Sequence, residues 1–108
     1  MLFIAAKLRE LFSSKASLTQ KYGPEGARRV MLRLQQLSAA EDMGDMKHLP
    51  GRVHELTGDR AGHQATDLDH PRRLIFRPTR PSLCLKPDGG IDWTAVDSIT
   101  VIGIAEYH

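Results

Sequence analysis

The chain has 108 residues, enough for one hydrophobic core and too few for two, so we expect a single domain spanning residues 1–108. Its composition, 41% hydrophobic and 26% charged, is that of a soluble globular protein. The single cysteine, Cys84, excludes an internal disulfide, and no spacing of cysteine and histidine resembles a zinc site. These features fit the reducing cytoplasm, where we expect the protein to reside.

The first half of the chain is predicted to be helical. A first helix follows from an apolar stripe at helical spacing, made of Ile4, Leu8, Leu11 and Phe12. The apolar start over residues 2–6 is too short to span a membrane. Gly23 and Pro24 suit the end of one helix and the beginning of the next. The second helix should end near Ala39–Ala40, with its arginines, including Arg33, on the solvated face.

The second half changes to patterns typical of strands. Strands are predicted over residues 53–56, 63–68, 73–77 and 98–104, with a glycine-bracketed turn at 58–62. Short turns between successive strands imply antiparallel pairing, and the nearly continuous apolar run of the last strand favours a central position. The predicted fold is therefore α+β, with two N-terminal helices packed on one face of an antiparallel sheet.

The charge is concentrated in the middle of the chain. Between Lys47 and Arg80 seven lysines and arginines face four acidic residues, which gives +3, whereas the net charge of the whole chain is +2. Four of the five histidines fall in the same window. A cationic, histidine-rich segment is what a phosphate-binding surface needs, although a solvated face is the alternative interpretation.

Three segments together carry a resemblance to a known family. They are the run from His54 to Gly62, the run from Asp67 to Phe76, and the terminal Glu106-Tyr107-His108. In this order they resemble the HigB branch of the RelE/ParE toxin superfamily, the plasmid-maintenance "killer" proteins, from about the second helix to the last residue. The resemblance implies a RelE-like, or microbial-RNase-like, fold, in agreement with the α+β architecture that the residue patterns predict.

The resemblance also implies an activity. Members of the family are metal-independent endoribonucleases that need no cofactor and cut messenger RNA on the ribosome. The reaction is attack of a ribose 2′-hydroxyl on the adjacent phosphate, which requires a base, an acid and cations. The positions that match the family's catalytic set are His54, Arg73, Glu106, Tyr107 and His108. We expect the basic residues Arg60, Arg52 and Lys47 to contact the RNA backbone.

These residue types suit the chemistry. Histidine exchanges protons near neutral pH, and the guanidinium of Arg73 can hold two phosphate oxygens at once. A tyrosine such as Tyr107 can donate a hydrogen bond or stack on a base. Each residue also has a purely structural alternative: Arg73, for example, would then pair with Asp67 or Asp69 across the sheet.

The resemblance implies partners as well. Such a toxin is made with an antitoxin, here expected to be a HigA-like helix-turn-helix protein, and meets operator DNA only through it. The ribosome and messenger RNA are the other expected partners, and no membrane is expected. We expect the antitoxin surface to be partly apolar and to include Leu2, Phe3 or Trp93.

Some positions depart from the family pattern. Thr57 replaces a basic residue, Gln64 a large apolar one, and Glu106 an aspartate. These departures leave two alternatives open. One is a degenerate relative that only binds the antitoxin and aids operon repression. The other is a ParE-type gyrase poison, which the presence of the His54-containing set disfavours.

Overall fold

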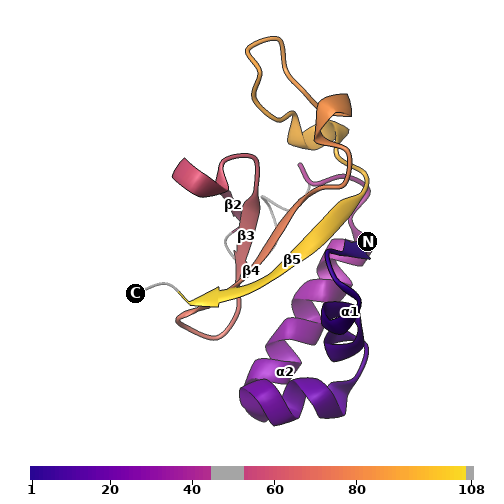
Figure 1. Cartoon of the computed structure of the whole chain (residues 1–108), viewed down its shortest axis with the longest axis vertical. Helices are drawn as coiled ribbons and strands as arrows, with labels where there is room; N and C mark the ends of the chain where they lie inside the picture. Colours follow the sequence, from indigo (N-terminus) through magenta and orange to yellow (C-terminus); the bar gives the residue numbers. More distant parts are fainter. Residues whose placement is uncertain (45–52, 107–108) are drawn as a thin grey trace.

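Two helices cover one face of a five-stranded sheet in the computed structural model, which describes residues 1–44 and 53–106 (Figure 1). The elements are β1 (Leu2–Phe3), α1 (Ala6–Phe12), α2 (Lys15–Ala39), β2 (His54–Glu55), β3 (Gln64–Asp67), β4 (Arg72–Pro78) and β5 (Ile99–Glu106). Short 3₁₀ turns lie between the strands: Gly58–Arg60 (η2) between β2 and β3, and Pro81–Leu83 (η3) and Trp93–Ala95 (η4) between β4 and β5. The predicted α+β class is therefore confirmed.

The sheet is mixed rather than wholly antiparallel. Its strand order is β1-β5-β4-β3-β2, and β5 lies between two other strands as predicted. β1 pairs with β5 in the parallel direction, with Leu2 opposite Thr100 and Phe3 opposite Val101. The prediction that the first half of the chain is helical before any strand begins is wrong, because Leu2 and Phe3 form an edge strand of the sheet. Phe3 also packs edge-to-face on Phe12 of α1, with ring centroids 5.6 Å apart.

The helical region contains two breaks. The predicted break appears as a kink inside α2, where Gly23 takes a positive φ of 79° that suits glycine alone among ordinary residues. The second break separates α1 from α2, and there the Ser14 side chain accepts a hydrogen bond from the backbone N–H of Ser17, 3.2 Å away. Ser14 is thus the N-cap of α2, which ends at Ala39 as predicted.

The core lies between α2 and the sheet. Ala27, Val30 and Leu37 of the helix belong to one buried cluster with Leu74 and Phe76 of β4. No helix within residues 1–44 and 53–106 is long and apolar enough to cross a membrane.

Arg33 is buried, contrary to the prediction that it faces solvent. Only 4% of the residue is exposed, and its Nε donates to the carbonyl oxygen of Asp67 at 2.8 Å. Burial lowers the pKa of the Arg33 guanidinium; the nearby Arg29 acts in the same direction and Asp67 opposes it. Arg33 thus joins α2 to the end of β3.

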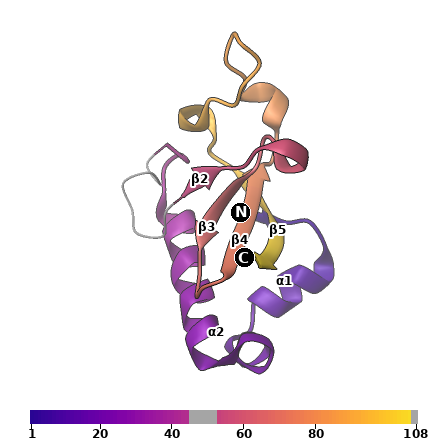
Figure 2. The same cartoon turned by 90° about the vertical axis from the view of Figure 1, so that its left-hand side faces the viewer.

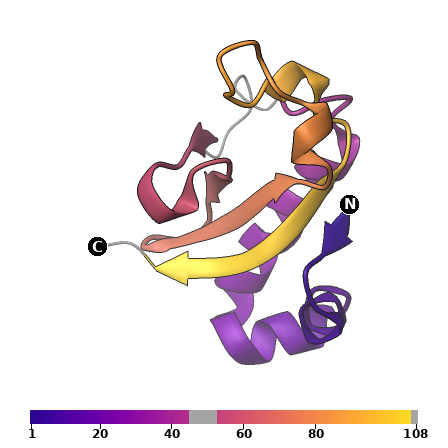
Figure 3. The same ribbon diagram turned by 45° about the horizontal axis from the view of Figure 1, so that its top comes forward.

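A β-bulge interrupts the pairing of the two longest strands, which run side by side across the molecule (Figure 3). Ile75 pairs with Gly103 and Phe76 with Val101, so Ile102 is an extra residue in β5. Beyond the bulge the alternation of β5 is reversed: Ile104 packs toward the core, opposite Leu74, and Gly103 and Ala105 lie on the other face.

The connection from β4 to β5 projects from one end of the sheet (Figure 2). It contains η3, η4 and an isolated bridge between Leu85 and Ile91. Trp93 in η4 is 4% exposed, and its indole N–H donates to the carboxylate of Glu55. The prediction that Trp93 contributes to a partner surface is therefore wrong, because the core and Glu55 already hold the ring.

Candidate functional site

The sheet face opposite the helices carries the candidate site. Successive side chains of a strand point to opposite faces. Since Leu74 and Phe76 pack under the helices, the other β4 side chains, Arg73, Ile75 and Arg77, lie on this second face. We call it the helix-free face.

His54 shares this face with Arg73. Its register partner is Ala65, which pairs in turn with Ile75, and residues directly opposite each other lie on one face. His54 and Arg73 are therefore two strands apart, about 10 Å across the sheet, and offset by about 7 Å along it. Side chains of these lengths can converge on one phosphodiester. The structure thus brings two of the predicted catalytic residues to the same surface.

Arg73 forms an ion pair with Asp67. The two residues are cross-strand partners, and Arg73 Nε lies 3.2 Å from Asp67 Oδ1, with side chains 29% and 26% exposed. This is the pairing that the structural alternative predicted. A phosphate would have to share the guanidinium with Asp67, and the phosphate-binding role of Arg73 stays a prediction.

Glu106 lies apart from these two residues. It pairs in register with Arg72, on the face that the helices cover, and its Oε1 lies 3.9 Å from Arg72 Nε. The structure therefore does not bring Glu106 to His54 and Arg73. The remaining predicted residues lie outside the described part of the chain, and their roles stay predictions: Tyr107, His108, Lys47 and Arg52.

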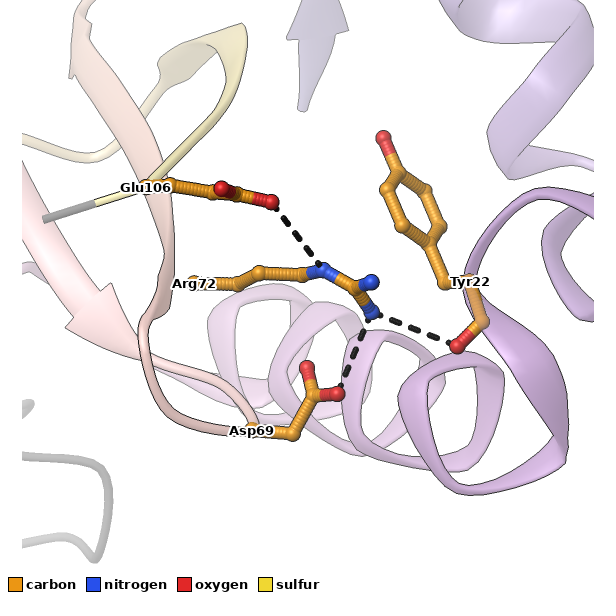
Figure 4. Close-up of polar contacts among 4 residues, drawn as sticks. All are labelled: Tyr22, Asp69, Arg72 and Glu106. Atoms are coloured by element: carbon orange, nitrogen blue, oxygen red, sulfur yellow. Dashed lines mark hydrogen bonds and ion pairs between the residues drawn. The ribbon is translucent and has the colours of Figure 1, made fainter.

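Arg72, which the sequence did not single out, is the centre of a polar cluster (Figure 4). Its Nη1 donates to the carbonyl oxygen of Tyr22 at 3.2 Å and to Asp69 Oδ2 at 3.1 Å. Its guanidinium lies over the Tyr22 ring, 5.0 Å from the centroid. Burial raises the pKa of the Tyr22 hydroxyl, and the charge of Arg72 opposes this shift. Asp69 and Arg72 are three positions apart, and this spacing was the one feature of the sequence that could have indicated their ion pair.

Arg60 lies at the edge of the sheet, in the exposed turn η2. A surface hollow there is lined by Leu56, Thr57, Asp59, Arg60 and His63. The Nδ1 atom of His63 lies 3.2 Å from the Arg60 carbonyl oxygen and 3.3 Å from that of Ala61, so His63 helps shape the turn. The hollow places Thr57, which departs from the family pattern, beside Arg60.

Among the described residues, no group of three histidine, cysteine, aspartate or glutamate side chains is arranged to hold a metal ion. The helix-free face offers an imidazole and two guanidinium groups. An imidazole exchanges protons near neutral pH, and guanidinium groups bind phosphate oxygens. The face therefore has groups that suit acid–base chemistry on a phosphodiester.

No family model matches the chain, and no curated protein matches it in sequence. Among solved structures it is similar to the YoeB–YefM complex from Staphylococcus aureus, with a TM-score of 0.57 and 11% sequence identity. The alignment covers 100% of this chain and 95% of the other. At this identity the likeness shows the fold: the chain has a RelE/YoeB-like architecture, as the sequence resemblance implied.

Proposed function

We propose that this protein is the toxin of a type II toxin–antitoxin pair and that it cuts messenger RNA on the ribosome. The observation that carries the proposal is the helix-free face, where His54 shares a surface with Arg73 and Arg77. The RelE/YoeB-like fold and the three sequence segments that resemble HigB toxins support it. Membership of the HigB branch is part of the proposal.

In the proposed reaction a ribose 2′-oxygen attacks the adjacent phosphorus while the bond to the leaving 5′-oxygen breaks. One group takes the 2′-hydroxyl proton and another gives a proton to the 5′-oxygen, so the products are a 2′,3′-cyclic phosphate and a 5′-hydroxyl. His54 is one of these two groups and His108 the other. Arg73 stabilises the charge on the phosphate, and Tyr107 contacts the neighbouring base.

Glu106 takes a different part in this proposal. Its carboxylate faces Arg72 rather than His54. Glu106 therefore has a positioning role: it helps to hold the end of β5 in place and does not contact the substrate. Arg60, Arg52 and Lys47 are proposed to contact the RNA backbone, which adds sequence-independent affinity.

The proposed partner is a HigA-like helix-turn-helix antitoxin, through which the protein would meet operator DNA. Two observations support a protein partner. The similar solved structure is itself a complex, of YoeB with YefM. The first residues of this chain also leave apolar side chains exposed: Met1 by 43%, Leu2 by 53% and Ile4 by 55%.

The test is induction of this gene alone in a bacterial host, followed by cleavage assays in a purified translation system. We expect growth arrest, relief by the gene encoded beside it, and cleavage of a translated message. The same RNA without ribosomes should stay intact at physiological salt, where a mildly basic chain binds free RNA only weakly. Normal growth despite soluble expression, or efficient cutting of free RNA, would contradict the proposal.

A non-catalytic binding module is the second candidate, and the Arg73–Asp67 ion pair favours it, since this pair neutralises the proposed phosphate-binding charge. Such a protein would bind the antitoxin and strengthen operator binding without arresting growth. A gel-shift measurement with operator DNA, antitoxin and this protein, made beside the growth assay, separates the two candidates.

A further inference from the structure

Arg77 occupies a second position on the helix-free face. It lies four residues from Arg73 on β4, on the same face and about 13 Å along the strand. Its cross-strand partner on β5 is Thr100, and the side chain is partly exposed. Arg77 is thus separated from Arg73 by Ile75 and lies toward the other end of the strand.

The charge of Arg77 is balanced differently from that of its neighbours. Arg72 pairs with Asp69 and Glu106, and Arg73 pairs with Asp67. The guanidinium of Arg77 donates only a long hydrogen bond, 3.4 Å, to the carbonyl oxygen of Pro78, and no carboxylate within residues 1–44 and 53–106 lies within ion-pair distance of it. Of the β4 arginines, Arg77 is therefore the one whose charge is not balanced by a carboxylate of the described residues, so an external anion would not have to compete for it there.

Hydroxyl groups gather beside Arg77. Ser98 Oγ donates to Thr79 Oγ1 at 3.0 Å, and Thr79 Oγ1 lies 3.1 Å from Thr100 Oγ1. Because Thr100 is directly opposite Arg77, its Cβ is expected about 5 Å from that of Arg77. Each hydroxyl has one proton and can rotate, so Ser98 can donate to a phosphate oxygen only if Thr79 donates to Ser98 instead. The exposed Ser98 would then supply one donor and Arg77, on the neighbouring strand, the positive charge, at the edge of a hollow that Arg80 and Asp97 also line.

We propose that Arg77, with the hydroxyls of Thr79 and Ser98, forms a second phosphate-binding subsite, which holds the backbone of single-stranded RNA at a phosphate other than the one that is cut. The inference rests on the proposed function, because that function supplies RNA as the ligand. It adds that the substrate runs along β4, from Arg73 toward the β4–β5 connection.

The test measures binding of a fluorescently labelled single-stranded 2′-O-methyl RNA, which lacks the attacking hydroxyl, as a function of salt concentration. Loss of one phosphate contact on a single strand should reduce the slope of log affinity against log salt by about 0.7. We expect this reduction for Arg77→Gln and for Arg77→Met, which keeps an apolar stem. Arg77→Lys should keep most of the slope, because the charge remains.

Arg9→Gln is the matched control, since it removes the same charge from an exposed position on α1, away from this face. Its salt slope should stay at the wild-type value. An unchanged slope for both neutral Arg77 variants would overturn the inference, and so would a wild-type protein that does not bind the probe at the lowest salt. Neither result depends on cleavage, so the growth and translation assays still test the proposed function separately.

Discussion

Arg72 lies directly opposite Glu106 on the neighbouring strand, and the same guanidinium donates to the backbone carbonyl of Tyr22 on α2. Its third partner, Asp69, belongs to the turn between β3 and β4. One side chain therefore joins three separate segments: the kinked helix, a turn and the end of the last strand (Figure 4). A planar group with several fixed donors suits this arrangement.

Replacement of Arg72 by lysine should destabilise the protein by about 1–2 kcal/mol, since an ammonium group cannot reproduce the hydrogen bonds that the guanidinium makes with Tyr22 and Asp69. Urea unfolding measures the change. Arg28→Lys is the control, because Arg28 pairs with Glu25 on the solvated surface and its replacement should have little effect. Equal effects of the two changes would argue against the role of Arg72.

Gly26→Ala should destabilise the protein, although alanine is normally the better helix former. A Cβ at position 26 would lie 2.8 Å from Tyr22 Cβ and 3.0 Å from Arg72 Nη1. We expect a loss of about 1–3 kcal/mol in the free energy of unfolding. Ser38→Ala, at an exposed site of the same helix, should instead be neutral or slightly stabilising. Stabilisation by Gly26→Ala would mean that the cluster around Arg72 adjusts freely.

Gln64→Met should stabilise the protein by about 1 kcal/mol, because methionine has a similar shape and has no amide to desolvate. Gln64 is 1% exposed, and its Oε1 is buried without a hydrogen-bond partner among residues 1–44 and 53–106. Thermal unfolding of the variant measures the effect. Gln64→Glu, which would bury a charge in the same space, should destabilise it. If methionine also lowers the stability, the amide makes a favourable interaction after all.

Arg73→Lys should reduce cleavage of translated messages at least about tenfold while leaving thermal unfolding nearly unchanged, because a point charge does not replace a guanidinium that holds phosphate oxygens. If Arg73 serves only to pair with Asp67, lysine should keep the pair and the activity. Cleavage rates of the two proteins at equal concentration decide between these outcomes.

Removal of Tyr107 and His108 should abolish toxicity without loss of antitoxin binding. If thermal unfolding of the truncated protein matches that of the wild type, a functional effect of this deletion is specific. His108→Ala alone should lower the cleavage rate by about 10²–10⁴, the usual effect of losing a positioned acid or base. A truncated protein that folds and remains fully toxic would show that neither residue takes part in catalysis.

Much of the fold could be predicted from the local pattern of residues. The end of α2, the break at Gly23 and the position of β4 follow from helix punctuation and apolar spacing, which depend on neighbouring residues. β1 could not be predicted, because a strand of two residues is too short to show an alternating pattern. Its partner strand, β5, comes about a hundred positions later in the sequence. Buried Arg33 was missed for a related reason: its acceptor, the Asp67 carbonyl, is 34 residues away.

The candidate site was predictable only in part. His54 and Arg73 lie on one face of the sheet, and both belong to the set of residues that the resemblance predicted to act together. Glu106 is on the opposite face because the extra residue Ile102 reverses the alternation of β5, and no simple periodicity reveals such a bulge. The contacts of Arg72 join residues as many as 50 positions apart, so they require the folded chain.

The bulge at Ile102 also determines how this chain should be aligned with others. A protein with the same fold but a regular last strand needs a one-residue gap at this point. Without the gap, each residue from Gly103 to Glu106 would be matched to one on the wrong side of the sheet. Roles transferred through such an alignment would be assigned to the wrong surface, even where the amino acids are identical.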